Sequence, residues 1–189
     1  MRAKFLPLMT GTPVYCYATK DALLDSYLPN NNFPNHGANL AGNASFEGYF
    51  ERYYRFVIAF KTALIPQEEI LKLELRFNVT GFTNKHELEY IDLFLHKVLE
   101  PWQDDQPTWN TQPLYEEEPF ETVRIRFADL QIGENIFIEV NKEYVMNYFQ
   151  DGILIKSAEE QIPDETVIGF ASRHSGITED IPALIIYQK

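Results

Sequence analysis

The sequence predicts an all-β protein, an antiparallel jelly-roll β-sandwich with one short helix near residues 141–151. Apolar and polar residues alternate with a period of two in several short segments, which is typical of strands with one buried and one solvated face. Turn-forming Gly, Pro and Asn residues separate these segments. Apolar residues recur at the spacing of a helix in one segment alone, 141–151. Eight or more short strands against one helix favour a sandwich.

The 189 residues are sufficient for one sandwich domain. Residues 1–18 contain Pro and Thr and are predicted to form an N-terminal arm, followed by a single domain at 19–189. The apolar end of the arm, 14–18, is expected to pair as an edge strand. We expect the arm to be held by its own domain or by a neighbouring subunit, because chain ends are seldom ordered unless something binds them.

The clearest strand prediction is at 70–77. Leu71, Leu73 and Leu75 alternate there with charged residues, so one face of this strand is expected to be solvated. The segment 54–61 has a continuous apolar centre, which favours a strand buried on both faces or covered by the arm. Further strands are predicted at 89–98, 122–127, 136–140, 153–156, 167–172 and 183–187.

The segment 141–151 interrupts the strand pattern. Apolar residues from Tyr144 to Phe149 recur at helical spacing. Asn141 suits the N-cap of a helix and Gly152 suits its C-terminal end. One short helix is therefore predicted here.

A long loop is predicted at 102–113, where both tryptophans of the chain lie together with two adjacent carboxylates. Pro107 and Pro113 exclude a helix, because proline lacks the backbone N–H and clashes with the preceding turn. Trp102 stands at the end of a predicted strand and is expected to cover the core. Trp109 either packs structurally or offers a flat platform on which a sugar ring stacks.

The net charge of −12 limits the partners. Nucleic acid binding depends on a basic face, so no nucleic acid partner is expected. The negative net charge also disfavours binding to anionic lipid surfaces and polyanionic glycans, whereas it is compatible with binding to a neutral glycan. Cys16 is the single cysteine, which excludes a disulfide framework.

The sequence contains no apolar run of about 18 residues, so no membrane insertion is expected. The N-terminus begins with basic residues, but Pro7, Thr10 and Pro13 interrupt its apolar part. A signal peptide needs about 7–15 apolar residues at this place. No signal peptide is therefore predicted in this chain, and we expect it to be made in the cytoplasm.

Several motifs resemble the DNRLRE domains. The most specific is Trp-x-x-x-x-Pro-Thr-Trp-Asn-x-x-Pro at 102–113. The other matching positions are Asp21-Ala22, Pro29, Asn32, Phe33, 55–60, Ile65-Pro66, 170–172, 182–184 and Tyr187. The resemblance covers about residues 19–187. It implies a jelly-roll sandwich of the kind grouped with non-catalytic carbohydrate-binding modules, found in surface and secreted proteins.

The chain also departs from the pattern of these domains. Lys61 stands where they usually have Asp, Pro34 stands where they usually have Gly, and the run near the C-terminus reads 172–175 as Ser-Arg-His-Ser. Some DNRLRE domains resemble binders of anionic polysaccharide, which requires basic residues on the ligand face. The net charge of this chain argues against that ligand.

The ligand-binding residues that we expect are Trp109, Asn110, Tyr115, Arg173 and His174. Trp109 would stack on a sugar ring and Asn110 would form hydrogen bonds with it.

Two neighbouring carboxylates are the only cofactor candidates. Asp104 and Asp105 are either solvated or oxygen ligands of a calcium ion, since Ca²⁺ prefers hard oxygen ligands. The acidic run at 116–118 is expected to be solvated. No other cofactor is expected.

No catalytic residues are predicted. Glycoside hydrolysis needs two carboxyl groups at a defined separation, and the sequence nominates no such pair. Ser172, His174 and Asp180 are the residue types of a hydrolytic triad, but the strand-turn-helix context of a nucleophile elbow is missing.

The sequence thus predicts a non-enzymatic subunit of an extracellular or virion (phage-type) assembly, displayed on the particle surface and associated with further copies of itself. Carbohydrate binding is a candidate activity of this subunit. A free-standing glycan-binding module of a polysaccharide-degrading system is the alternative, and a polysaccharide-active enzyme is the least favoured one.

Overall fold

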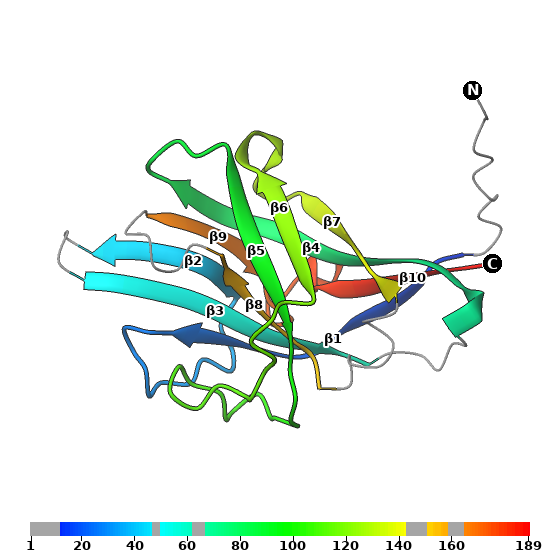
Figure 1. Ribbon diagram of the computed structural model, residues 1–189, viewed down its shortest axis with the longest axis horizontal. Coiled ribbons are helices and arrows are strands. Elements are labelled where there is room, and N and C mark those ends of the chain that lie inside the picture. The colour runs from blue at the N-terminus through cyan, green and yellow to red at the C-terminus, as the bar shows by residue number, and fades with distance from the viewer. Residues whose placement is uncertain (1–11, 47–49, 62–66, 143–150, 159–164) are drawn as a thin grey trace.

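The computed structural model describes residues 12–46, 50–61, 67–142, 151–158 and 165–189 (Figure 1). Strands and three short 3-10 helices make up its regular structure. The strands are β1 (Val14–Asp25), β2 (Ala38–Phe46), β3 (Phe50–Phe60), β4 (Ile70–Asn84), β5 (Tyr90–Lys97), β6 (Glu121–Arg126), β7 (Asn135–Val140), β8 (Ile153–Ser157), β9 (Thr166–Ala171) and β10 (Ala183–Gln188). The 3-10 helices are η1 (Gln67–Glu69), η2 (Phe127–Asp129) and η3 (Thr178–Asp180).

The strand pairings described are all antiparallel. A smaller sheet consists of the first part of β1, then β10, the first part of β4, and β7. It lies on the right of Figure 1. A larger sheet contains the second part of β4, then β9, β2 and β3, with the rest of β1 and the series β8, β5 and β6 attached to β3.

Two strands belong to both sheets. β1 pairs with β10 through residues 14–17 and with β3 through residues 18–25, with a register shift between Ala18 and Lys20. β4 pairs with β10 and β7 in its first part and with β9 after a register shift between Val79 and Gly81. Such bulges bend a strand, which lets it pass from one sheet to the other.

The core lies between the two sheets. Phe56 of β3, Phe77 of β4 and Phe170 of β9 are fully buried, with ring centroids 5.1 to 6.0 Å apart. Rings at this spacing gain edge-to-face contacts as well as apolar burial. Aliphatic residues of the smaller sheet, such as Leu75 and Ile186, complete this cluster from the opposite side.

Gly42 shows how closely the strands of the larger sheet approach one another. β2 pairs with both β3 and β9 at this residue. Its φ angle is 129°, and a Cβ atom here would lie 2.1 Å from the carbonyl oxygen of Thr166. Only glycine fits without moving the backbone of β9.

The predicted fold class is confirmed, because the regular structure of the described residues is almost entirely antiparallel strands arranged as a sandwich. The alternation at 70–77 is that of β4, with Lys72, Glu74 and Arg76 pointing away from the core. The predicted helix falls mainly on residues 143–150, outside the described residues. The structure adds β2, which was not predicted as a strand, and extends β1 across the expected boundary between residues 18 and 19.

Within the described residues, no helix has the length and apolar character needed to cross a bilayer.

Candidate functional site

The loop that joins β5 to β6, residues 98–120, covers the outer side of the larger sheet; we call it the tryptophan loop. It lies at the bottom of Figure 1, beside the loop at 26–37. Trp102 and Val98 form a second apolar cluster with residues from three strands, and Trp109 and Tyr115 pack against it. The strand residues of this cluster are Ala22 and Leu24 of β1, Val57 and Ala59 of β3, and Leu154 of β8.

Trp102 covers this second cluster, as predicted, and is only 3% exposed. Its indole Nε1 donates a hydrogen bond to the carbonyl oxygen of Asp151 at 2.7 Å. Lys20 of β1 donates to the carbonyl oxygen of Trp102 at 2.7 Å and places its ammonium 4.6 Å from the ring centroid. The buried indole is thus satisfied at its polar end and held by a cation–π contact.

Trp109 is half-buried and rests on β3. The guanidinium carbon of Arg55 lies 4.4 Å from its ring centroid. The ring of Tyr53 stacks beside it at 6.4 Å with an interplanar angle of 25°. Tyr53 and Arg55 are two residues apart on one strand, so they share a face and support the indole together.

Arg55 connects Trp109 to Tyr115. Its Nη1 donates to the side-chain oxygen of Gln112 at 3.0 Å and to the Tyr115 hydroxyl at 3.4 Å. The Tyr115 ring also meets the buried ring of His96 at 5.2 Å. The structure therefore brings Trp109 and Tyr115 together through one guanidinium.

Asn110 is exposed and ties two loops together. Its backbone N–H donates to the carbonyl oxygen of Pro29 at 3.0 Å, and its Nδ2 donates to Oδ1 of Asn30 at 3.0 Å. Asn32 of the same neighbouring loop donates to the carbonyl oxygens of Asp104 and Pro107 at 3.0 and 2.7 Å. Asn110 thus has a structural role, and its contact with a ligand stays a prediction.

Arg173 follows β9 and reaches the tryptophan loop from the other side. Its guanidinium donates to the carboxylate of Asp104 and lies 3.6 Å from that of Asp21. Its backbone N–H donates to Asp21 Oδ2 at 2.8 Å. Arg173 is brought to the loop at Asp104, whereas Trp109 and Tyr115 are grouped around Arg55.

Asp21 is 3% exposed at the centre of this ionic group. Burial raises its pKa above the usual value, although hydrogen bonds from Asn39 and from the Arg173 backbone, and the Arg173 charge, act in the opposite direction. Asn39 Nδ2 donates to Asp21 Oδ2 at 2.8 Å. This buried carboxylate of β1 therefore links that strand to the start of β2 through Asn39 and to the end of β9 through Arg173.

His174 lies beside this group. Its backbone N–H donates to Ser172 Oγ at 2.9 Å, while the Ser172 hydroxyl donates to the carbonyl oxygen of His36. The His174 Nε2 atom is buried and has no hydrogen-bond partner.

The two calcium candidates differ in their surroundings. Asp104 accepts the backbone N–H of Asp21 at Oδ1, at 3.2 Å, and the Arg173 guanidinium at Oδ2. Asp105 is exposed. In the part of the chain that the structure describes, no group of three or more His, Cys, Asp or Glu residues is placed to hold a metal ion.

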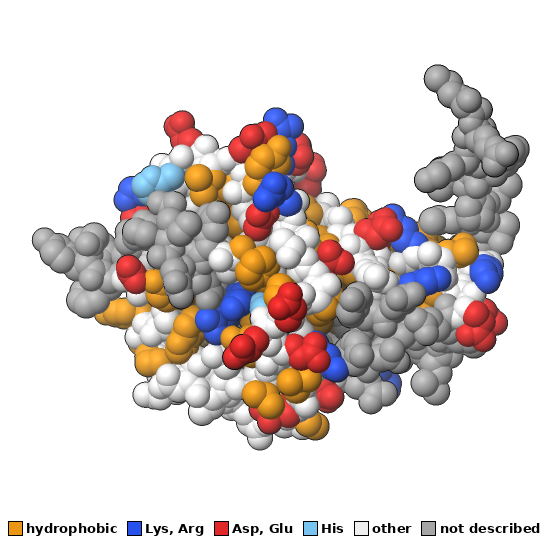
Figure 2. Space-filling model, in the orientation of Figure 1, with side chains coloured by type: hydrophobic (Ala, Val, Ile, Leu, Met, Phe, Trp, Pro, Cys, Tyr) orange, Lys and Arg blue, Asp and Glu red, His pale blue; other side chains and the backbone are white. Residues whose placement is uncertain are grey.

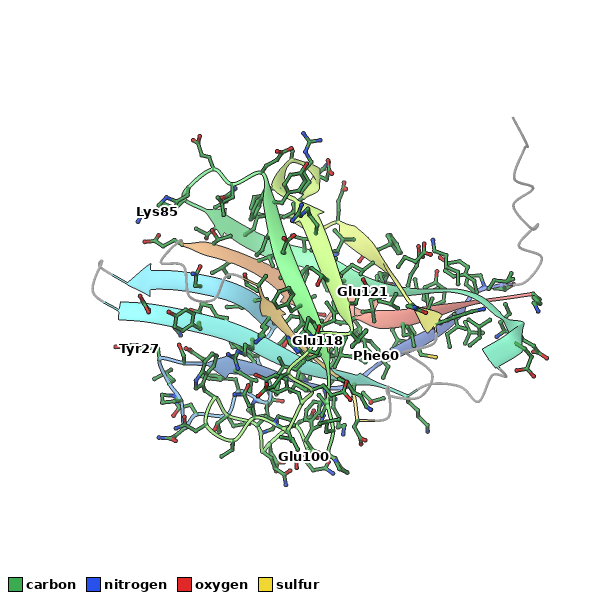
Figure 3. The ribbon with its side chains drawn as sticks, viewed as in Figure 1. Tyr27, Phe60, Lys85, Glu100, Glu118 and Glu121 are labelled. Atoms are coloured by element: carbon green, nitrogen blue, oxygen red, sulfur yellow. The ribbon has the colours of Figure 1, made fainter. Side chains whose placement is uncertain are left out.

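The tryptophan loop is strongly acidic. From residue 98 to residue 120 the sequence contains six carboxylates and neither Lys nor Arg. Acidic side chains gather over the lower part of the molecule in Figure 2, where this loop lies. Figure 3 places Glu100 at its lowest point and Glu118 close to the start of β6. An anionic ligand would be repelled at this surface.

A second surface, which sequence reasoning missed, covers the outer side of the smaller sheet; we call it the tyrosine face. Its residues alternate along the strands with residues of the core, so they point away from it. They are Tyr15, Tyr17, Lys72, Glu74, Arg76, Phe137, Glu139 and Tyr187. Tyr15, Tyr17 and Phe137 are 45%, 43% and 54% exposed.

An ionic network crosses one end of the tyrosine face. Lys72 lies 2.6 Å from Glu74 and 3.3 Å from Glu139, and the Tyr187 hydroxyl donates to Glu74 at 2.6 Å. Burial alone would raise the pKa of Glu74, but the hydrogen bonds from Lys72 and Tyr187 lower it below the usual value. The bond to the Glu74 carboxylate raises the pKa of Tyr187 to about 12.

The sequence did carry one signal for this face. Tyr15 and Tyr17 are two residues apart in the predicted edge strand, so they had to share a side of the sheet. Their position next to Arg76 and opposite Phe137 depends on the order of the strands, which no local pattern encodes.

A scan against protein-family models finds no match for this chain, and a search of curated proteins finds no similar sequence. The resemblance to DNRLRE domains therefore stays a prediction made from the quoted motifs.

Proposed function

We propose that the chain is a non-enzymatic β-sandwich subunit of an extracellular or virion assembly that associates with further copies of itself. The observation that carries this proposal is the exposure of Tyr15, Tyr17 and Phe137 on one face of the smaller sheet. A group of exposed aromatic side chains on one sheet face is the kind of surface at which proteins bind partners. The resemblance to domains of surface and secreted proteins supports the extracellular or particle location.

The polar groups most suggestive of catalysis are engaged in structural contacts. The Ser172 hydroxyl donates to a backbone carbonyl oxygen, and Asp21 and Asp104 both contact the Arg173 guanidinium. These contacts favour the non-enzymatic alternative over the polysaccharide-active enzyme. Turnover of any glycan by the purified protein would contradict it.

Size measurement tests the assembly role. Light scattering after size exclusion should give a mass larger than one chain, and mass spectrometry of purified extracellular particles should detect the protein in them. A protein that is monomeric at every concentration and absent from all particles would remove this proposal.

The second candidate activity is binding of a neutral glycan by the tryptophan loop, either in the assembly or as a free-standing module. A half-buried indole supported from one strand by Arg55 and Tyr53 is the observation that favours it. Indole rings provide a large flat apolar surface, and the six carboxylates of the loop disfavour anionic glycans.

Affinity electrophoresis in gels that contain neutral polysaccharides tests this activity. The wild-type protein should be retarded, Trp109→Ala should lose the retardation, and Tyr90→Ala should keep it, because Tyr90 is an exposed aromatic residue outside the loop. Equal mobility of all three proteins in every gel would exclude glycan binding by the tryptophan loop.

A further inference from the structure

The aromatic residues of the tyrosine face form a fixed layer. The rings of Tyr15 and Tyr17 stack with centroids 6.4 Å apart and an interplanar angle of 23°. The guanidinium carbon of Arg76 lies 5.7 Å from the centroid of each ring. Arg76 is held in turn by the hydrogen bond that its Nη2 donates to the carbonyl oxygen of Ile181 at 2.8 Å. Little side-chain freedom remains to be lost when this layer meets another surface.

The composition of the layer is that of a protein contact. Tyr, Phe and Arg are the residue types enriched at the centres of protein–protein interfaces. Ala183 and Ile185 of β10 lie between the aromatic residues and are fully buried. The face is therefore a continuous sheet of side chains.

The charges of the tyrosine face cancel. Lys72 and Arg76 contribute two positive charges, and Glu74 and Glu139 contribute two negative ones, which sum to zero. The whole chain carries −12. Two copies repel each other through their acidic surfaces, so the least costly approach is through a face without net charge.

We propose that the tyrosine face binds the tyrosine face of a second copy in a two-fold symmetric contact. A two-fold interface uses the same patch on both subunits, so the patch must be complementary to itself. A face that carries both signs of charge and a central aromatic layer satisfies that requirement. This inference rests on the proposed assembly role and specifies the surface that mediates it.

Sedimentation velocity over a concentration series tests the contact with two matched variants. Phe137→Asp and Ile132→Asp each replace an exposed apolar side chain by a carboxylate, at 54% and 68% exposure, but only Phe137 lies on the tyrosine face. We expect the wild type and Ile132→Asp to form the same dimer. Phe137→Asp should weaken it at least about tenfold, the effect of losing one aromatic anchor.

A double variant on β1 makes the test independent of any local defect that Phe137→Asp causes in β7. Tyr15→Ser with Tyr17→Ser should weaken the dimer in the same way, with the circular dichroism of the β-sheet unchanged. An oligomer that persists in both the Phe137 and the tyrosine variants would overturn the contact proposed here while leaving the assembly role intact.

A wild type that stays monomeric up to its solubility limit would overturn the two-fold contact, and it would overturn the assembly role as well if the protein is also absent from purified particles. If that monomer binds a neutral polysaccharide and Phe137→Asp abolishes the binding, the occupant of the face is a glycan and the two-fold contact is wrong.

Discussion

The guanidinium of Arg55 lies 4.4 Å from the Trp109 ring centroid and also reaches the side chains of Gln112 and Tyr115, so one residue of β3 holds the middle and the end of the tryptophan loop. Strand β3 is fixed on both sides by its neighbours β1 and β8. The loop therefore rests on a rigid part of the sandwich although it contains no regular secondary structure of its own over 99–114.

Replacing Arg55 by Met should destabilise the fold by about 0.5–2 kcal/mol, the value of a partly desolvated cation–π contact. Urea unfolding followed by circular dichroism measures the change. Arg124→Met is the control, because the Arg124 side chain is 64% exposed and its contacts with Asp92 and Tyr90 lie at the surface, where such contacts contribute about 0–1 kcal/mol. Equal free energies of unfolding for the two variants would mean that Arg55 does not support the loop.

The two tryptophans should differ in their contribution to stability. Trp102→Ala removes a 3% exposed indole and its hydrogen bond to Asp151, and should cost about 3–5 kcal/mol. Trp109→Ala should cost clearly less, because Trp109 is only half-buried. Chemical denaturation measures the free energy of unfolding of the two variants. A larger loss of this free energy in Trp109→Ala than in Trp102→Ala would contradict the assignment of Trp102 as the cover of the second cluster.

The hydroxyl of Tyr187 should lose its proton only at an unusually high pH. Its hydrogen bond to Glu74 raises its pKa to about 12, against about 10 in an unfolded chain. A pKa raised on folding stabilises the fold fully below pH about 10, and this contribution is lost as the pH rises through about 12. Subtracting the phenolate absorbance titration of Tyr187→Phe from that of the wild type should isolate this midpoint.

The cause of the shift is checked by a second variant. Glu74→Gln removes the carboxylate that accepts the hydrogen bond, so the midpoint of Tyr187 should fall toward about 10. A midpoint that is near 10 in the wild type already would show that the contact is not formed in solution.

Added calcium should leave the melting temperature unchanged, and so should a chelator. Both carboxylate oxygens of Asp104 already accept hydrogen bonds, and a calcium ion prefers six to eight oxygen ligands. Differential scanning fluorimetry measures the response. If calcium raises the melting temperature of the wild type but not that of Asp104→Asn, the calcium site suggested by the sequence would be supported after all.

The fold class was predictable because one-sided burial leaves a period-two pattern. Leu73 and Leu75 alternate with charged residues in the first part of β4 for this reason. The second part was not predicted, since the register shift between Val79 and Gly81 moves the strand into the other sheet and breaks the alternation. β2 was missed because its small and amide residues, such as Asn39 and Asn43, are buried without an apolar pattern.

The site was less predictable than the fold. Trp109 and Tyr115 stand out as aromatic residues in a loop, but the side chains that position them come from β3. Arg173 was expected at a ligand, and its contact with Asp104 joins segments that are distant in the sequence. Such contacts depend on the order of the strands, so they become visible only in three dimensions.

β1 and β4 each contribute hydrogen bonds to both sheets. Neither layer can therefore open without breaking the backbone ladder of the other, and the sandwich should lose its structure in one cooperative step. Amide protons of β10 and of β3 should accordingly exchange with solvent at similar slow rates, as members of a single unfolding unit.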